Sequence, residues 1–456
     1  MRVAWFTPVR DGAIVDYSRG VLAAMLRLRE VHLFCNGPPD RFPAGIPAAD
    51  LAAGPQALSD LSSFDAVFYN LGNDFREHAW IFDIARLHPG IVVLHHLTLH
   101  RFFLDYYLQH LRRPDLYITR MVEHYGIAGL TTAHRVLGPW FDPESARVDD
   151  ADLLRYTFTE EALRSARGAV VHSRWHGAVV RELWSGPVCE AWLPTQRASA
   201  SSVPAETQGD ELDDHRITLM TLGPVEPRSH VADVIGLLAE DPDLAARTRY
   251  VIAGPDDPAD TYVRELNATI AESGLARSVR VLGDLPPHEL DRCARAADVF
   301  INLRHPDDEG CSVSLMYQLQ FGKPVVTYDG GSFAEIPDEA VAKTTIGDRA
   351  GLRRNLRELV DSAARRQAVG TAGRRFADGH GARDYARELL RFAERDVSAA
   401  VAESLDQAGS RAVAERMANH IGETLSSLGA TPASPGVEAV IREVGRLLWP
   451  PQAEPL

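Results

Sequence analysis

Cysteine and lysine are both scarce in this chain of 456 residues. The four cysteines are Cys35, Cys189, Cys293 and Cys311. They are widely spaced and form no Cys-x-x-Cys pair, which argues against a structural zinc site and is typical of a reduced, cytoplasmic protein. Lys323 and Lys343 are the only lysines. Neither lies in the context that a pyridoxal-dependent enzyme would need for its dedicated lysine.

Positive charge is also lacking. The net charge is −15 at pH 7, so no basic stripe is available for a nucleic-acid partner. No apolar run approaches the length of a membrane span. The N-terminal MRVAWFTPVRDG predicts a strand and a loop rather than a signal peptide. A Gly-x-Gly-x-x-Gly motif is missing after the first strand, which argues against a nicotinamide dehydrogenase.

Short apolar runs alternate with amphipathic stretches along most of the chain. In the N-terminal half we expect strands at Val3–Phe6, Val31–Cys35, Ala66–Tyr69, Ile91–His95 and Val170–His172. After a polar, acidic segment we expect them at Ile217–Thr221, Tyr250–Ala253, Val279–Leu282, Val299–Leu303 and Val325–Tyr328. Strands separated by helices favour parallel sheets that are covered on both faces. The sequence therefore predicts an α/β protein with two Rossmann-like domains.

Residues 301–338 are the most informative segment for function. A buried strand ends in the polar loop Asp307–Ser312, which leads into a helix and then a second buried strand. Ligands of open α/β sheets bind beyond the carboxyl ends of such strands. Free N–H groups at a helix start favour an anion such as a diphosphate. Because a carboxylate beside an anion site suits a neutral polyol, Glu309 indicates a sugar nucleotide as the ligand.

This segment resembles the donor-site signature of the retaining glycosyltransferases usually called family 4, which have the GT-B fold. Those enzymes carry two glutamates separated by seven residues and then a Gly-x-Pro-Val-Val run. Glu309 matches the first glutamate, Tyr317 replaces the second, and residues 322–326 match the run. The resemblance implies that Glu309 holds sugar hydroxyls and that residues 310–312 meet the diphosphate through backbone groups.

Three histidines follow the strand that we expect at Ile91–His95. In the family, a histidine at the position of His95 lies near the donor sugar, and His100 matches a further family histidine. A neutral imidazole can hydrogen-bond to sugar hydroxyls, and an imidazolium can stabilise the leaving phosphate. The alternatives are ordinary strand-end residues or a metal cluster, although no supporting cysteine or carboxylate spacing accompanies these histidines.

Other segments supply further candidate site residues. Arg228 and Arg304 would offset the leaving-group charge, since the Lys-Arg pair of the family is replaced by Ser229-His230. The predicted catalytic residues are His95, Glu309 and Arg228. The predicted donor contacts are Gly12, Arg228, Arg304, Leu285, Glu309, Gly310, Cys311, Ser312, Val313 and Tyr317. The predicted acceptor contacts are Asp16, Asn70, Asn73, His96 and His100.

The resemblance implies a GT-B plan with an acceptor-side domain (1–197), a linker or mobile loop (198–214), a donor domain (215–380), a crossover helix (381–396) and a helical extension (397–456). It also implies a metal-independent, retaining transferase that uses a GDP- or UDP-sugar as co-substrate and needs no further cofactor. We expect a small-molecule acceptor in antibiotic or other specialised metabolism, including S-glycosyl transfer to a thiol or thione as in lincosamide assembly. A homodimer through the C-terminal helices is a further expectation.

Two other functions stay open on the sequence. A non-catalytic subunit that binds sugar nucleotides would account for the missing Lys-Arg pair. A sugar-nucleotide epimerase of the same fold would act without an acceptor.

Overall fold

The computed structural model describes residues 1–10, 12–53, 58, 61–138, 148–195, 215–305 and 310–397. The chain forms two compact units, Met1–Ala393 and Glu394–Leu456, and both sheets lie in the first. The sequence features predicted at Glu309, at 198–214 and at 398–456 lie outside the described residues.

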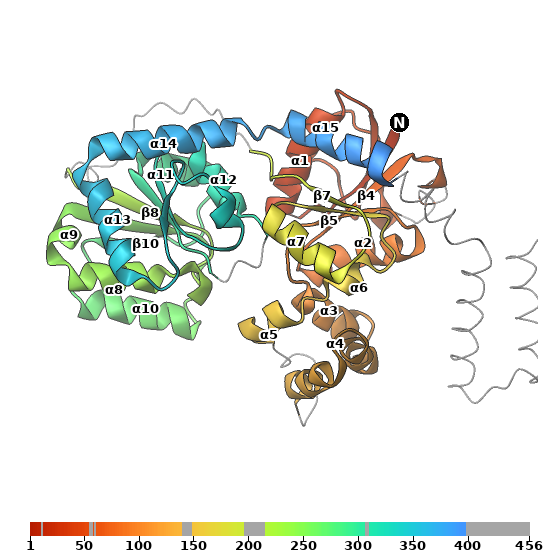
Figure 1. The fold of residues 1–456 in the computed structure, drawn as a ribbon, viewed down its shortest axis with the longest axis horizontal. Helices are drawn as coiled ribbons and strands as arrows, with labels where there is room; N and C mark the ends of the chain where they lie inside the picture. Colours follow the sequence, from red (N-terminus) through yellow and green to blue (C-terminus); the bar gives the residue numbers. More distant parts are fainter. Residues whose placement is uncertain are drawn as a thin grey trace, which may run out of the picture. The chain divides into compact units, whose positions relative to one another are not determined.

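The first sheet has seven strands in the order β3-β2-β1-β4-β5-β6-β7, and every pairing is parallel (Figure 1). Its strands are β1 (Arg2–Phe6), β2 (Glu30–Cys35), β3 (Ala48–Asp50), β4 (Ala66–Leu71), β5 (Ile91–Leu94), β6 (Gly168–Val171) and β7 (Val188–Glu190). The interior strand β5, Ile-Val-Val-Leu, is buried at every position. Such apolar runs are what strands covered on both faces require.

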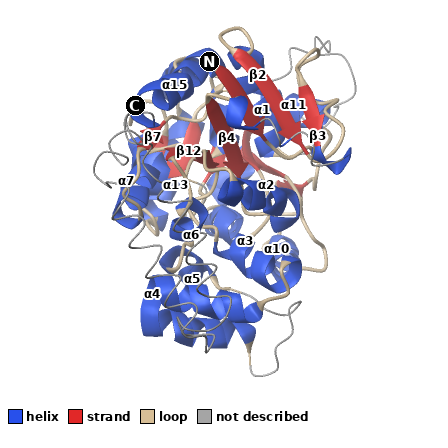
Figure 2. Ribbon diagram, turned by 90° about the vertical axis from the view of Figure 1, so that its right-hand side faces the viewer, coloured by secondary structure: helices blue, strands red, loops and turns tan. Residues whose placement is uncertain are grey.

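The helices of this half are α1 (Ala13–Met25), α2 (Phe75–Leu87), α3 (His100–Asp105), α4 (Pro114–Leu137), α5 (Asp150–Arg155), α6 (Thr159–Leu163) and α7 (Arg174–Leu183), with the π-helical turn η3 (Tyr106–His110) and the 3₁₀ turn η1 (Leu51–Ala53). Most of α3 to α6 is an insertion between β5 and β6, and a cluster of buried aromatic rings joins it to the sheet. Figure 2 shows these helices gathered at one end of the first sheet.

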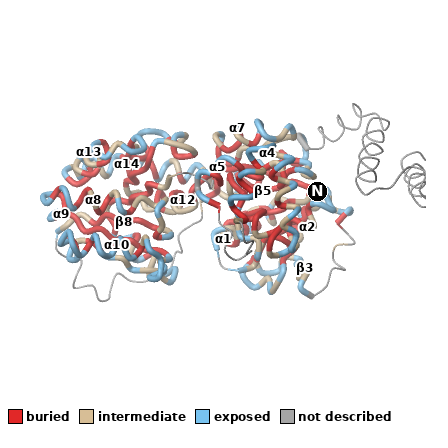
Figure 3. The backbone as a smooth tube through the Cα atoms, turned by 90° about the horizontal axis from the view of Figure 1, so that it is seen from below, coloured by how far each residue is buried: buried red, intermediate tan, exposed pale blue. Residues whose placement is uncertain are grey.

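The second sheet has six parallel strands in the order β10-β9-β8-β11-β12-β13. Its strands are β8 (Ile217–Leu222), β9 (Thr248–Ala253), β10 (Val279–Val281), β11 (Val299–Asn302), β12 (Val325–Tyr328) and β13 (Ala342–Thr344). Its helices are α8 (Val231–Glu240), α9 (Pro242–Arg247), α10 (Thr261–Glu272), α11 (Pro287–Ala296), α12 (Val313–Leu319), α13 (Arg349–Asp361) and α14 (Ala363–Asp378), with turns η4 (Pro227–Ser229) and η5 (Gly331–Glu335). Figure 3 shows the strands of both sheets as buried tube, with exposed residues on the surrounding helices.

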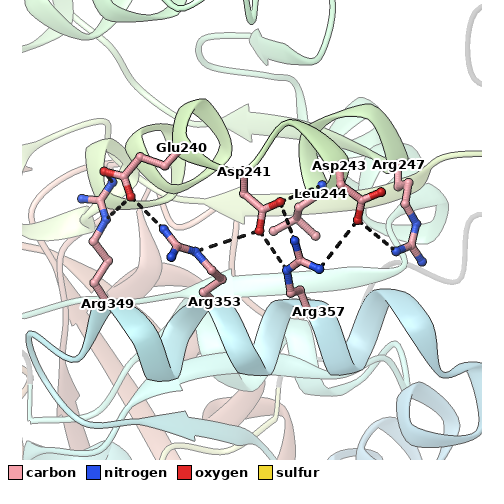
Figure 4. A network of polar contacts seen from close by, with 8 residues as sticks. All are labelled: Glu240, Asp241, Asp243, Leu244, Arg247, Arg349, Arg353 and Arg357. Carbon is pink, nitrogen blue, oxygen red and sulfur yellow. Dashed lines mark hydrogen bonds and ion pairs between the residues drawn. The ribbon is translucent and has the colours of Figure 1, made fainter.

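A ladder of ion pairs fixes α13 to the corner between α8 and α9 (Figure 4). Glu240 pairs with Arg349 at 2.8 Å and with Arg353 at 2.7 Å. The buried Asp241 accepts two hydrogen bonds from Arg357, at 2.7 and 2.9 Å, and also caps α9 through the amide of Leu244. A two-pronged arginine contact of this kind is stronger than a single exposed ion pair.

The C-terminal part of the first unit returns to the first sheet. Helix α15 (Ala382–Phe392) packs against α1, and the hydroxyls of Tyr17 and Tyr385 lie 2.7 Å apart in a fully buried contact. The π-helical turn η6 (Ala393–Val397) follows α15. At the earlier passage of the chain, the Thr195 amide donates to the carbonyl of His380 at 2.8 Å, and Thr195 forms a parallel bridge with Gly381.

Residues 102–125 are mostly helical but do not form one helix. The segment divides into α3, η3 and the first half of α4, because Arg112 takes a positive φ of 55° and Pro114 starts a new helix. The predicted strand end at His95 is also one residue too long, since β5 ends at Leu94. The short strands β3, β7 and β13 were not predicted.

Candidate active site between the two sheets

The donor-side part of the site begins where β11 ends and α12 starts. Ser312 caps α12 by accepting a hydrogen bond from the Leu315 amide at 3.2 Å. The Asn302 side chain donates to the Ser314 hydroxyl at 3.1 Å and to the Gln318 carbonyl at 3.1 Å. These contacts hold the start of α12 to the end of β11.

The residues next to this cap differ in exposure. Cys311 is buried, and Val313, the first residue of α12, is half-buried. Gly310 precedes them with a φ of +71°, a conformation that favours glycine.

Two predicted arginines meet at one carboxylate. The guanidinium of Arg304 donates to Glu226 at 2.6 Å, and that of Arg228 donates to the same carboxylate at 3.3 Å. The Arg228 carbonyl also accepts from the His305 amide at 3.0 Å, which ties the two loops together. The cluster of these three charged side chains carries one net positive charge, which is suited to an anionic ligand.

The family's basic pair is replaced by Ser229 and His230, whose side chains contact the segments around them. Ser229 donates to the Glu226 carbonyl at 2.6 Å. His230 has a left-handed backbone, lies 2.8 Å from an Asp233 oxygen, and lies 3.0 Å from the His305 carbonyl. Arg228 and Arg304 therefore remain the candidates for a diphosphate contact.

Tyr317 and Leu285 lie further along the donor half. The Tyr317 hydroxyl donates to Asp291 on α11, and burial together with that carboxylate raises the tyrosine pKa. Leu285 is half-buried in the turn between β10 and α11. Neither residue has a contact in the structure that tests its predicted donor role.

The acceptor-side part contains a chain of side chains at the ends of β4, β5 and β6. Asn70 is buried and donates to the Phe6 carbonyl at 2.8 Å. The side-chain oxygen Oδ1 of Asn70 lies 3.1 Å from Nε2 of His95. Nδ1 of His95 lies 3.3 Å from Nε2 of His172, whose Nδ1 lies 3.2 Å from the Ala191 carbonyl. Both ring nitrogens of His95 are thus engaged, so a sugar contact through either one requires an exchange of partners.

His176 is a site residue that the sequence did not suggest. It lies in α7, is fully buried, and finds no hydrogen-bond partner for either ring nitrogen among the residues that the structure describes. Its ring packs so closely against Gly310 that a Cβ added there would collide with Nδ1. The string His172-Ser-Arg-Trp-His176 at a strand end resembles His95-His96 in position, and that was the available signal.

A carboxylate from the donor half binds the start of α7. Glu335 in η5 accepts from the amides of Arg174 at 3.1 Å and Trp175 at 2.5 Å, and it pairs with the Arg174 guanidinium at 3.3 Å. An anion at a helix N-terminus is favourable because it satisfies free amides and opposes the helix dipole. Glu335 therefore fixes α7, and with it His176, relative to the second sheet.

Burial makes the histidines of this region poor proton acceptors. Burial lowers the pKa of His78 and of His172 to about 4, and that of His176 to about 3. Burial, followed by repulsion from His172, His96, His78 and His176, lowers the pKa of His95 well below its usual range. These imidazoles are neutral at pH 7, and no carboxylate is among the groups that shift the pKa of His95.

The remaining predicted acceptor residues do not share one environment. His100 is buried among aromatic rings, with Nε2 at 2.7 Å from the Tyr117 hydroxyl and its ring against Phe158. This environment is that of a core residue, and we do not retain His100 in the acceptor site. Asn73 and His96 lie half-buried in the loops after β4 and β5.

Two predicted residues lie near the start of α1. Asp16 pairs with Arg19 at 2.7 Å on the exposed side of that helix. Gly12 immediately precedes the helix, and its carbonyl accepts hydrogen bonds from the amides of Val15 and Asp16. A Cβ added at Gly12 would meet nothing within 4 Å, so the protein itself does not require glycine there.

Two absences hold within the described ranges. No group of three or more histidine, cysteine or acidic side chains is arranged there to hold a metal ion. None of the helices described is both long and apolar enough to cross a membrane.

The architecture matches known enzymes. HepE of Anabaena in complex with UDP superposes with a TM-score of 0.55 and 13% identity over 86% of this chain and 99% of that one. Sucrose-phosphate synthase of Thermosynechococcus elongatus superposes with a TM-score of 0.56 and 15% identity, over 87% of this chain and 99% of that one. A glycosyltransferase of Rickettsia africae superposes with a TM-score of 0.56 and 8% identity, over 87% of this chain and 98% of that one. The two parallel-sheet domains thus have the GT-B fold of glycosyltransferases.

A match in sequence narrows the class. Residues 204–376 match the family model described as "Glycosyl transferases group 1". The second half of the chain thus matches a glycosyltransferase family in sequence, and the described residues as a whole have the GT-B fold. No curated protein matches the chain.

Proposed function

We propose that the protein transfers a sugar from a nucleotide-diphosphate sugar to a small-molecule acceptor, with retention at the anomeric carbon. The observation that carries this proposal is the junction at Gly310, where the ring of His176 from the first half packs against the loop that opens α12. Arg228 and Arg304 stand on the loops next to it. This arrangement supports a donor pose with neutral imidazoles beside the sugar and the two arginines beside its diphosphate.

The residues present divide the work of the reaction. Arg304 and Arg228 bind the diphosphate and offset its charge as the bond from the anomeric carbon to phosphate oxygen breaks. His176 and Glu309 hydrogen-bond to sugar hydroxyls and hold the ring in place. The acceptor atom forms the new bond to the anomeric carbon, and the leaving phosphate takes the acceptor's proton. Retention of configuration is an inference from the family that the sequence resembles.

UDP and GDP are the leading nucleotides. UDP is supported by the similar solved structures, since HepE was solved in complex with UDP and with UDP-glucose. GDP is retained from the resemblance. The acceptor class that we favour is a specialised metabolite, including a thiol or thione sulfur. We place the enzyme in the cytoplasm, where nucleotide sugars are made.

A binding panel tests the proposal. UDP, GDP, dTDP and ADP are added with and without magnesium, and unfolding is followed by heat. A nucleotide at about 100 times its dissociation constant adds roughly 2.7 kcal/mol to the free energy of unfolding. We expect one nucleotide to bind, without dependence on magnesium, and the matching nucleotide sugar to be consumed when an acceptor is present. No stabilisation by any of them would remove the proposal.

Two variants sharpen this test. Arg304→Gln should weaken nucleotide binding at least tenfold, because it removes a cation from the diphosphate side. The matched control Arg353→Gln removes an arginine of the α13 ladder and should leave binding unchanged. Nucleotide binding without donor hydrolysis or transfer would favour the non-catalytic subunit. That outcome is motivated by the replacement of the family's basic pair, since Ser229 bonds to the Glu226 carbonyl and His230 contacts the His305 carbonyl. Conversion of the donor sugar in the absence of any acceptor would favour the epimerase.

A further inference from the structure

The hydrogen-bond chain through His95 and His172 lacks one proton. It contains three contacts: Oδ1 of the Asn70 side chain with His95 Nε2, His95 Nδ1 with His172 Nε2, and His172 Nδ1 with the Ala191 backbone carbonyl. Each contact needs one hydrogen. Two neutral imidazoles carry only one N–H each, so one of the three contacts has no hydrogen when both rings are neutral.

The two ends of the chain cannot relieve this shortage. The Ala191 carbonyl only accepts, so His172 must donate to it through Nδ1. The Asn70 amide group donates to the Phe6 carbonyl at 2.8 Å, which directs the Asn70 oxygen toward His95. Reversing the amide would place its oxygen against the Phe6 carbonyl. The shortage therefore falls on the contact between Nδ1 of His95 and Nε2 of His172, where two lone pairs face each other at 3.3 Å.

One added proton would complete all three contacts, but its charge needs a partner. Among the described residues, the titratable groups near the pair are His78 on α2, His96 after β5 and His176 on α7, together with Tyr17, Tyr385 and Cys189; Glu388 lies beyond Tyr385 on α15. No carboxylate of these described residues acts on either ring, and burial keeps both tyrosines neutral by raising the pKa of each. A buried cation without a counter-ion is unfavourable, so the pair stays neutral in the free protein.

An anionic ligand changes this balance. His176 is within electrostatic reach of His172 and also packs against Gly310, so the pair lies one residue away from the loop that opens the donor half. A bound diphosphate would supply a negative charge that the described residues near the pair do not. We propose that binding of the nucleotide-diphosphate sugar is coupled to uptake of one proton, shared between Nδ1 of His95 and Nε2 of His172. This inference rests on the proposed function, since it requires that the donor binds.

The consequence is a cation that exists only in the donor complex. It would add one positive charge to a site in which Ser229 and His230 replace the lysine and arginine of the family. The proton comes from solvent, and no covalent bond is made or broken in taking it up.

Calorimetry of donor binding tests the coupling. The probes are UDP-glucose, GDP-glucose, dTDP-glucose and ADP-glucose, whose diphosphates carry no proton that titrates near neutrality. Whichever binds is titrated into the full chain in buffers of different ionisation enthalpy, between pH 8 and pH 6. We expect a net uptake that rises toward one proton per protein as the pH falls.

Three variants assign the proton. His172→Phe removes one ring of the pair, and uptake should disappear. Asn70→Leu keeps both histidines but removes the acceptor of the His95 Nε2–H. The hydrogen of His95 can then move to Nδ1 and bond to His172, so two hydrogens complete the two remaining contacts. Proton uptake should therefore also disappear. The control His100→Phe removes a buried histidine outside the chain, and uptake should persist.

Each outcome has a distinct meaning. Donor binding without proton uptake would overturn the inference and leave the proposed function standing. Uptake that survives in both His172→Phe and Asn70→Leu would also overturn it, because the proton would then bind elsewhere. If none of the four sugar nucleotides bound, the proposed function and this inference would fail together. Circular dichroism establishes that each variant is folded. If only one of His172→Phe and Asn70→Leu folds, that variant alone tests the inference.

Discussion

The buried histidines of the first half should make the protein sensitive to mild acid. In the described residues, burial lowers the pKa of His78, His95, His100, His172 and His176. In the unfolded chain each returns to a pKa of about 6.5. Above that pH both states are neutral and the stability is complete. As the pH falls below about 6.5, the histidines of the unfolded chain bind protons while those of the folded protein stay neutral, so the free energy of unfolding decreases.

The size of the effect follows from linkage. At pH 6, an unfolded histidine with a pKa of about 6.5 carries roughly 0.75 proton, so unfolding should take up about four protons at the five sites. Summed over these sites, the free energy of unfolding should fall by about 3 kcal/mol from pH 7 to pH 6, and by about 6 kcal/mol from pH 7 to pH 5.5. The second figure is comparable with the whole stability of many domains.

Intrinsic fluorescence can follow this loss selectively. Every tryptophan except Trp449 lies within residues 1–195, so urea denaturation monitored by tryptophan emission reports mainly on the first sheet and its helices. The control is pH 8, where proton uptake should vanish. His100→Phe should remove one site's share of the pH dependence, about 0.7 kcal/mol between pH 7 and pH 6. A free energy of unfolding that stays flat from pH 8 to pH 6 would refute the reasoning.

Three further predictions concern single contacts. Asp241→Ala should destabilise the second sheet's domain by roughly 2–4 kcal/mol, because it leaves the Arg357 fork and the α9 start without their acceptor; urea denaturation followed by circular dichroism measures it. Gly310→Ala should lower donor affinity at least tenfold by displacing His176. Gly322→Ala is also at positive φ, but a Cβ there would make only ordinary van der Waals contacts, the nearest with Arg374 at 3.8 Å. It should leave donor affinity within about twofold in the same calorimetric assay, with a stability loss of roughly 1 kcal/mol. Glu335→Gln should lower kcat/KM at least tenfold in transfer assays, because α7 loses its bound carboxylate, and unchanged kinetics would contradict the role given to this contact.

Much of the fold could be predicted because the signal lay in long, buried strands. Val3–Phe6, Val299–Asn302 and Val325–Tyr328 are buried at every position and mostly apolar, and parallel strands covered on both faces require that composition. The three-residue strands β3, β7 and β13 carry too few residues for any period to show. The break between η3 and α4 depends on one backbone angle at Arg112, and no sequence pattern at an arginine predicts a positive φ.

The site was harder to predict than the fold because its groups come from distant parts of the chain. His95 could be predicted from the resemblance, but its pairing with His172 depends on the register of β5 and β6. His176 acquires its position only through Glu335 and Gly310, more than a hundred residues away in sequence. His100 matched a family pattern and yet lies in the aromatic core, since a strand-end histidine can turn inward as readily as outward.

The bridge between Thr195 and Gly381 has a mechanical consequence. The chain passes between the two sheets once after Thr195 and once before α15, and the amide and hydroxyl of Thr195 tie these two passages together at the carbonyls of His380 and Ala377. Two connections pinned at a common point resist sliding but not turning, as the pin of a hinge does. Opening and closing of the site should therefore proceed as a rotation about this point. The large displacements would then fall on Gly310 and His176, and the small ones on the pinned segments.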